Sequence, residues 1–201
     1  MQFVPLSREF YNPSAEVVAP LLLGHWLVRN TPEGFCGGPI VETEAYLKND
    51  AACHAARGET KRNRTMWGAP GHSYVYLIYG LHYCVNAVCH PAGSAEAVLI
   101  RAIEPAIGET FMRSQRPVAQ LQNLTSGPAK LCSALNIGRE IDGVDLCDSQ
   151  SPLFIAENPT VERTKLNLGP LIQTTRIGIT KAAELPMRFY LDKSLFVSKR
   201  L

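Results

Sequence analysis

The residues of this chain best suited to chemistry lie in the run VETEAY, residues 41–46. Glu42, Glu44 and Tyr46 alternate here with small or apolar residues, so an extended strand would present two carboxylates and a phenol ring on one face. A carboxylate can activate water for attack on a glycosidic bond, while an adjacent ring holds a flat substrate. Alternation alone does not choose between Glu42 and Glu44, and it equally fits ordinary acids on a solvent-facing strand.

Basic residues gather a little further along the chain. Between residues 57 and 64 there are four of them, against the single acid Glu59: Arg57, Lys61, Arg62 and Arg64. Such a local excess can neutralise phosphates, whereas a net charge of +2 for the whole chain gives no argument for nucleic-acid binding. A solvated basic loop without a partner is the alternative interpretation.

Aromatic residues and one amide follow in the segment from residue 73 to residue 89. Tyr74 and Tyr76 share one face of a predicted strand, and the alternation does not distinguish them as stacking partners. Tyr79 can lie near them only if it occupies a turn, which Gly80 favours. Asn86 stands in the apolar run YCVNAVC, so its amide either bonds to neighbouring backbone or faces a pocket, because an unpaired buried amide costs about 1–3 kcal/mol.

Together these motifs resemble those of the alkyladenine (3-methyladenine) DNA glycosylase family, of the methylpurine DNA glycosylase type. The matching segments are VETEAY, His54, RGETKRNRTM, SYVYLIYG followed by Asn86, VLIRAIEP and SGPAKLC, in the family's order and over most of the chain. The resemblance implies a monofunctional base-excision-repair enzyme. Such an enzyme flips alkylated or deaminated purines (3-methyladenine, 7-methylguanine, hypoxanthine, ethenoadenine) from duplex DNA and hydrolyses the N-glycosidic bond with water, leaving an abasic site.

The resemblance also implies roles for residues around the reacting bond. Glu44, two residues before Tyr46, is expected to be the general base, and Arg101 is expected near the attacking water and a phosphate. An ion pair of Arg101 with a strand acid is the structural alternative. The flipped base is expected to contact four residues: Tyr46, His54, Tyr76 and Asn86. Asn86 would face the 2-amino group that distinguishes guanine, whereas His54 could instead be an ordinary loop histidine.

A second set of residues is expected to contact the DNA. Tyr79 would be the wedge that fills the gap in the base stack, and the other contacts would come from Arg62, Arg64, Met66 and Lys130. Met66 could instead pack inside its own loop, and Lys130 stands near the start of a predicted helix. The basic C-terminal residues Lys199 and Arg200 are predicted to form a frayed tail.

The pattern of elements predicts a mixed α/β (α+β) fold rather than a doubly wound parallel sheet, because strands and helices do not strictly alternate. Helices are predicted from residue 12 to residue 24 and over 129–135, and strands over 25–29, 39–46, 73–78, 82–88, 97–103, 171–179 and 188–191. Residues 142–167 are predicted to be rich in loops. The family resemblance implies a curved, mostly antiparallel sheet flanked by helices, similar to the C-terminal domain of methionyl-tRNA formyltransferase.

Composition and cysteine content limit the remaining possibilities. A chain of 201 residues with 46% hydrophobic content suits one domain spanning residues 1–201. The six cysteines are expected to be reduced thiols. A metal site from His82, Cys84, Cys89 and His90 is disfavoured, because alternation places Cys89 on the face opposite to Cys84 and no CxxC spacing occurs. We therefore expect no metal and no cofactor.

The expected partner is double-stranded DNA that carries damaged purines. No apolar run is long enough to span a bilayer, so we expect no membrane association, and we expect a monomer in the bacterial cytoplasm, associated with the nucleoid. Two rival functions stay open. A non-catalytic nucleic-acid-binding module of the same fold would have no use for a costly carboxylate beside a phosphate path. A small-molecule nucleoside hydrolase would have no use for Tyr79 or the basic loop.

Overall fold

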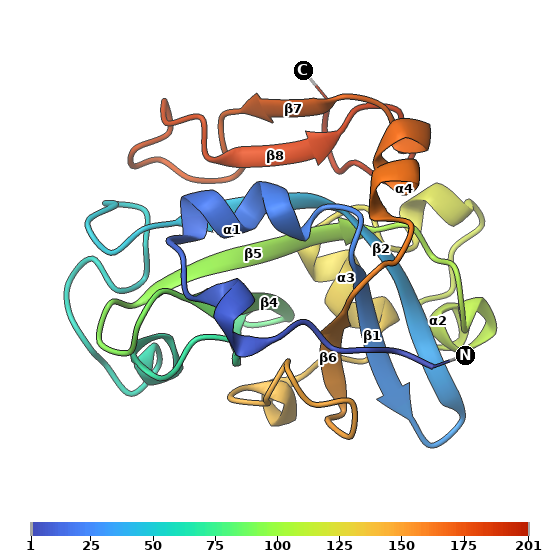
Figure 1. The fold of residues 1–201 in the computed structure, drawn as a ribbon, viewed down its shortest axis with the longest axis horizontal. Helices are drawn as coiled ribbons and strands as arrows, with labels where there is room; N and C mark the ends of the chain where they lie inside the picture. The colour runs from blue at the N-terminus through green and yellow to red at the C-terminus, as the bar shows by residue number, and fades with distance from the viewer. Residues whose placement is uncertain (1, 201) are drawn as a thin grey trace.

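A long strand, β2 (Gly34–Tyr46), organises the fold of the computed structural model, which describes residues 2–200. Strand β1 (Trp26–Thr31) pairs with the first half of β2, while β5 (Glu96–Ile103) and β8 (Arg188–Leu191) flank its second half. The sheet order is β3-β4-β5-β2-β1-β6, with β7 joined through β8, and every strand pair among these residues is antiparallel. The curved antiparallel sheet and flanking helices of Figure 1 confirm the predicted α+β class.

The other elements have the following bounds in chain order. The remaining strands are β3 (Ser73–Ile78), β4 (His82–Cys89), β6 (Leu153–Ala156) and β7 (Leu171–Thr174). The α-helices are α1 (Ala15–Leu22), α2 (Glu109–Gln115), α3 (Pro128–Ala134) and α4 (Val161–Leu168). Short 3-10 helices cover Arg8–Tyr11, Arg64–Trp67, Leu121–Asn123 and Arg139–Ile141. None of the helices formed by residues 2–200 is long and apolar enough to cross a membrane.

Most predicted elements are confirmed within a few residues, although β2 begins at residue 34 rather than 39 and helix α2 was not predicted. Two further corrections are needed. Strand β7 ends at Thr174, so residues 175–179 form a loop rather than the rest of a strand. The segment 142–167, which was predicted to be rich in loops, contains β6 and most of α4, and neither element was predicted. Strand β6 is only four residues long and fully buried, so it shows no polar–apolar alternation by which it could be recognised.

Helix α1 shows how local pattern and distant contacts combine. Its buried residues Ala15, Val18, Ala19 and Leu22 follow the i, i+3, i+4, i+7 spacing of an amphipathic helix. The side chain of the N-cap residue makes no capping hydrogen bond; instead the carboxylate of Glu96, on β5, accepts a 2.9 Å hydrogen bond from the backbone N–H of Ala15. The helix start predicted near residue 14 is therefore completed by a strand distant in sequence.

The two faces of the sheet have different roles. The residues that enter the main core with α1 and α3 alternate along β3, β4 and β5: Val75, Val85, Ala87, Val98 and Ile100. The residues between them turn to the opposite face and line one cavity: Tyr74, Tyr76, Cys84, Asn86, Leu99 and Arg101. Strand alternation thus separates a face that stabilises the fold from a face that builds a site.

Candidate active site

The cavity on the second face has a volume of about 320 Å³, enough for a small planar ring system. Besides the strand residues, it is lined by Tyr46 of β2, by His54 and Arg62 of the long loop 47–72, and by Pro128 at the start of α3. The loop after β7 contributes residues 177–179. Four separate regions of the chain therefore converge on one concave surface.

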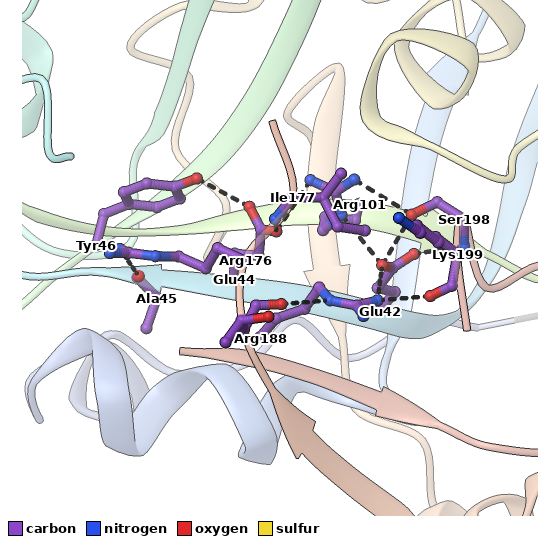
Figure 2. A network of polar contacts seen from close by, with 11 residues as sticks. Glu42, Glu44, Ala45, Tyr46, Arg101, Arg176, Ile177, Arg188, Ser198 and Lys199 are labelled. Carbon is purple, nitrogen blue, oxygen red and sulfur yellow. Dashed lines mark hydrogen bonds and ion pairs between the residues drawn. The ribbon is translucent and has the colours of Figure 1, made fainter. Parts of the chain in front are cut away.

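Glu44 lies directly behind the cavity wall and is completely buried. Its Oε1 atom forms an ion pair with Arg101 at 3.1 Å and accepts a hydrogen bond from the backbone N–H of Ile177 at 2.8 Å. Its Oε2 atom accepts one from the hydroxyl of Tyr46 at 2.8 Å (Figure 2). All three donors belong to residues that line the cavity. A carboxylate offers about four acceptor positions, so Glu44 keeps one free on Oε2.

Glu42 lies on the same strand face but in a different environment. Its Oε1 atom accepts hydrogen bonds from Arg101 at 3.1 Å, from Arg188 at 2.9 Å and from the hydroxyl of Ser198 at 2.8 Å. Its Oε2 atom accepts the backbone N–H of Ser198 at 2.7 Å. Of the three residues that supply these four hydrogen bonds, only Arg101 lines the cavity, whereas Arg188 and Ser198 lie outside its lining. Strand alternation could not distinguish the two acids, but their surroundings differ sharply.

Arg101 joins the two acids through its buried guanidinium group. The register between β2 and β5 shifts at this point: Glu42 pairs with Ala102 and Thr43 with Ile100, so Arg101 has no direct partner across the ladder. Such a bulge redirects a side chain, here toward both carboxylates. Burial alone would lower the pKa of Arg101, but the charges of Glu44 and Glu42 raise it above its ordinary value. The ion pair considered from the sequence exists, and Arg101 also lines the cavity.

Aromatic rings form the opposite side of the cavity. His54 packs edge-on against Tyr76, with ring centroids 4.4 Å apart and an interplanar angle of 78°. Its Nδ1 atom lies 2.9 Å from the hydroxyl of Tyr74, a buried residue that also lines the cavity. Partial burial lowers the pKa of His54, and the charge of Arg62 lowers it further, which favours a neutral ring at pH 7. Tyr76 is only partly buried, whereas Tyr74 is buried and its hydroxyl is hydrogen-bonded to His54.

Asn86 satisfies both interpretations made from the sequence. Its side-chain nitrogen donates a 2.9 Å hydrogen bond to the backbone oxygen of Tyr74, its neighbour across the β3–β4 pair. The residue also lines the cavity, and its side-chain oxygen accepts no hydrogen bond from residues 2–200. Backbone contact therefore fixes the direction of an amide whose oxygen is available to a ligand.

The β3–β4 hairpin ends in Tyr79, as the turn prediction required. Tyr79 adopts a positive φ of 53°, which is unusual for a residue with a side chain, and Gly80 follows with φ 71°. The Tyr79 side chain is 82% exposed, and Leu81 beside it is 77% exposed. Tyr79 also contributes to the cavity rim. A backbone held in a sparsely populated region to project two apolar side chains into solvent is typical of a functional tip.

The residues predicted to contact DNA fall into different places. Arg62 lies on the rim, donates to the backbone oxygen of Leu77 at 3.0 Å and stands over the Tyr76 ring. Arg64 is exposed and pairs with Glu59 at 3.1 Å. Lys130 reaches Ser126 and Asn123 at 3.3 Å each.

Met66 does not lie on the exposed surface where a duplex could pack. It is 2% exposed, belongs to a small apolar cluster and lines the cavity. Its position corresponds to the alternative of internal packing, because the 3-10 helix that carries it turns its side chain inward.

Two parts of the site consist of residues that were not predicted from the sequence. The loop after β7 provides the Ile177 N–H and the buried Arg176, whose guanidinium stands 4.7 Å from the Tyr46 ring centroid (Figure 2). Arg176 also pairs with Asp50. The C-terminal segment provides Ser198, and Arg200 donates to the backbone oxygen of Ser194 at 2.8 Å. The prediction of a frayed tail is therefore wrong. Main-chain donors leave no residue-type signal in a sequence.

The side chains of residues 2–200 form neither a metal-binding cluster nor a disulfide. Across residues 2–200 there is no group of three histidine, cysteine or acidic side chains arranged to hold a metal ion. The six cysteines are unpaired thiols. The chemistry available in the cavity is that of a buried carboxylate, a guanidinium group, an amide and several aromatic rings.

Comparisons with known proteins show which family this chain resembles. The family model described as methylpurine-DNA glycosylase (MPG) matches residues 9–195. A relative from Methanoculleus marisnigri, named "Putative 3-methyladenine DNA glycosylase", is 47% identical over 97% of this chain and 99% of its own length. Proteins with the same name from Carboxydothermus hydrogenoformans and Francisella tularensis are 45% and 46% identical, over 97% and 90% of this chain and 99% and 92% of their own lengths.

Proposed function

The chain belongs to the methylpurine-DNA glycosylase family of DNA-repair enzymes, and we propose that it flips alkylated or deaminated purines out of duplex DNA and hydrolyses their N-glycosidic bonds. The observation that carries the proposal is the difference between the two strand acids. All three partners of Glu44 line the cavity and its Oε2 accepts a single hydrogen bond, whereas Glu42 is bonded mainly to Arg188 and Ser198, outside the cavity lining. A residue with one free acceptor position next to a purine-sized cavity suits the general base of a hydrolase.

In this proposal Glu44 accepts a proton from a water molecule that attacks C1′ of the damaged nucleotide. The glycosidic bond breaks as the water adds, so positive charge develops on the sugar and the purine leaves with the bonding electrons. The carboxylate also stabilises that developing charge. Arg101 holds Oε1 of Glu44 and remains protonated, which directs the free acceptor position on Oε2 toward the cavity.

The same proposal gives roles to the aromatic and amide residues. Tyr46 and Tyr76 hold the flipped base between them, and His54 completes the pocket as a neutral ring. Asn86, held in place by the backbone of Tyr74, selects against guanine by occupying the space that the 2-amino group would need. Tyr79 replaces the extruded base in the stack, and its exposure on a constrained hairpin supports that role. Arg62, Arg64 and Lys130 contact phosphates.

We propose a monofunctional mechanism, in which no covalent enzyme–DNA intermediate forms. Strand-cleaving glycosylases use an amine that attacks the sugar. No lysine is among the described residues that line the cavity, and the nearest candidates from the sequence, Lys48 and Lys61, are in the loop 47–72. The product would be an intact strand with an abasic site.

Single-turnover excision from a hypoxanthine-containing duplex tests the proposal. We expect release of free hypoxanthine and strand cleavage only after alkali treatment. Glu44→Gln should lower the rate by at least about 100-fold with binding of the damaged duplex retained, because the amide keeps the shape but cannot take the proton. Arg101 keeps Glu42 as a partner in that variant, so the fold should persist.

The rival functions predict other results. A binding module would bind the duplex and release no base. A nucleoside hydrolase would act on free deoxyinosine but not on the duplex. Excision at the wild-type rate by Glu44→Gln, together with an inactive Glu42→Gln, would assign the base to Glu42.

A further inference from the structure

The C-terminal segment, residues 194–200, is docked against the outer part of the site. Phe196 is 8% exposed and packs with Val41 and Ala102, the residues next to the bulge between β2 and β5. The hydroxyl of Ser194 donates to Glu104 at 2.8 Å. This segment is therefore held at both an apolar and a polar anchor before it reaches Ser198.

Ser198 is the point at which the segment meets the ionic network. Its backbone N–H and its hydroxyl both donate to Glu42, at 2.7 and 2.8 Å, while the hydroxyl oxygen accepts from Nη2 of Arg101 at 3.2 Å. Figure 2 shows the serine and Glu42 on one side of Arg101 and Glu44 on the other. Each nitrogen of the Arg101 guanidinium thus has one partner: Glu42 for Nε, Glu44 for Nη1 and Ser198 for Nη2.

The charges in this network are balanced. Glu42 and Glu44 carry two negative charges, and Arg101 and Arg188 carry two positive charges. Arg188 is held in addition by the backbone oxygens of Thr175 and Lys199, at 2.9 and 2.8 Å. Because Arg188 neutralises Glu42, the charge of Arg101 is available to Glu44.

We propose that Glu42 and Ser198 are positioning residues, through which the C-terminal segment fixes the guanidinium of Arg101 against Glu44. This inference rests on the proposed function of Glu44 and assigns the second buried acid a task other than proton transfer. A flexible arginine side chain loses rotamer entropy when it is fixed, and three simultaneous partners oppose that cost. A fixed guanidinium keeps the same acceptor position of Glu44 open for water in every catalytic cycle.

Single-turnover excision and duplex affinity of four proteins test the inference: wild type, Ser198→Ala, Ser198→Thr and Ser194→Ala. Ser198→Ala should lower the excision rate about five- to tenfold and leave the dissociation constant for damaged duplex within about twofold of wild type. Ser198→Thr keeps the hydroxyl on a half-buried position and should restore the rate. Ser194→Ala removes a hydroxyl from the same segment without touching Arg101 or Glu42, so it should excise at the wild-type rate even if its melting temperature falls.

A double-mutant cycle with Glu42→Gln extends the test. Because Ser198 acts through the same guanidinium, adding Ser198→Ala to Glu42→Gln should lower the rate by less than the product of the two single effects. The inference is overturned if Ser198→Ala excises at the wild-type rate, if Ser194→Ala loses as much, or if weaker DNA binding accounts for the loss. A wild-type protein that releases no base overturns the proposed function as well, whereas an active wild type with an unaffected Ser198→Ala variant overturns this inference alone.

Discussion

The hydroxyl of Tyr46 donates a 2.8 Å hydrogen bond to Oε2 of Glu44, so a wall of the cavity is bonded directly to the carboxylate behind it. The two residues share a strand face, and alternation alone brings them together. Burial raises the pKa of the Tyr46 hydroxyl, and the charge of Glu44 and this hydrogen bond raise it further, so the phenol stays protonated and donates. The contact gives Tyr46 two tasks, one through its ring and one through its hydroxyl.

Replacing Tyr46 with phenylalanine separates those tasks. Tyr46→Phe keeps the ring but leaves Oε2 of Glu44 without its protein donor, so we expect excision to fall about tenfold with duplex affinity unchanged. Tyr46→Leu removes the ring as well and should weaken binding of the flipped base in addition. Single-turnover rates and equilibrium binding of both variants make the comparison. An identical loss of affinity in the two variants would mean that the hydroxyl serves binding rather than chemistry.

Replacing Tyr79 with serine should impair flipping and leave the cavity intact. The Tyr79 ring compensates for the base stacking that is lost on flipping, which is worth a few kcal/mol. Tyr79→Ser should therefore lower the excision rate of hypoxanthine about tenfold in a paired duplex, and much less in a single strand, where there is less stacking to replace. Leu166→Ser, which alters a similarly exposed apolar residue on α4, is a matched control and should behave as wild type. Equal losses on paired and single-stranded substrates would place Tyr79 in the base pocket instead.

Neutralising Arg62 and Arg64 together should weaken binding to damaged and undamaged duplex alike. Phosphate contacts release counterions without reading bases. The slope of the logarithm of the binding constant against the logarithm of the salt concentration should therefore become less steep by about two in the double alanine variant. Arg163→Ala on α4 removes an exposed arginine elsewhere and should leave the slope unchanged. If the double variant keeps the wild-type slope, the loop 57–64 makes no phosphate contacts.

Replacing Asn86 with alanine should relax selectivity against guanine. The side-chain nitrogen is held by the backbone of Tyr74, which keeps the amide directed into the cavity. Asn86→Ala should raise guanine release from mismatched duplexes by at least about tenfold relative to hypoxanthine release. The lost hydrogen bond should also cost about 1–2 kcal/mol of stability. A parallel fall of both activities with a lower melting temperature would show that Asn86 is purely structural.

A pH dependence of stability is expected from His25. Partial burial and the charge of Lys165 lower the pKa of this histidine from 6.5 to about 4, and its Nδ1 accepts the backbone N–H of Asn158 at 3.2 Å. As pH falls, the unfolded chain binds the proton first, so the contribution of neutral His25 is complete above pH 6.5 and is lost toward pH 4.

Urea unfolding of His25→Gln and wild type at several pH values measures this effect. The advantage of wild type over His25→Gln should shrink as the pH is lowered from 7.5 to about 4.5. His82→Gln alters an exposed histidine on the hairpin and should follow the wild-type curve. A constant difference between wild type and His25→Gln across this range would contradict the assignment.

The sequence by itself determined those features that depend on neighbours along the chain. Period-two alternation placed Glu42, Glu44 and Tyr46 on one face, and Gly80 placed Tyr79 in a turn. Amphipathic spacing located α1. Such features follow from backbone geometry and the local arrangement of apolar residues, so they can be read without knowing which elements meet.

Only the tertiary structure shows how the surroundings of Glu44 and Glu42 differ. The distinction comes from donors far away in sequence: the Ile177 N–H for Glu44, and Arg188 and Ser198 for Glu42. It also depends on a register shift that directs Arg101 toward both acids. Main-chain donors and strand register leave no mark in residue type, and the environment of a buried carboxylate is the sum of groups that only folding brings together.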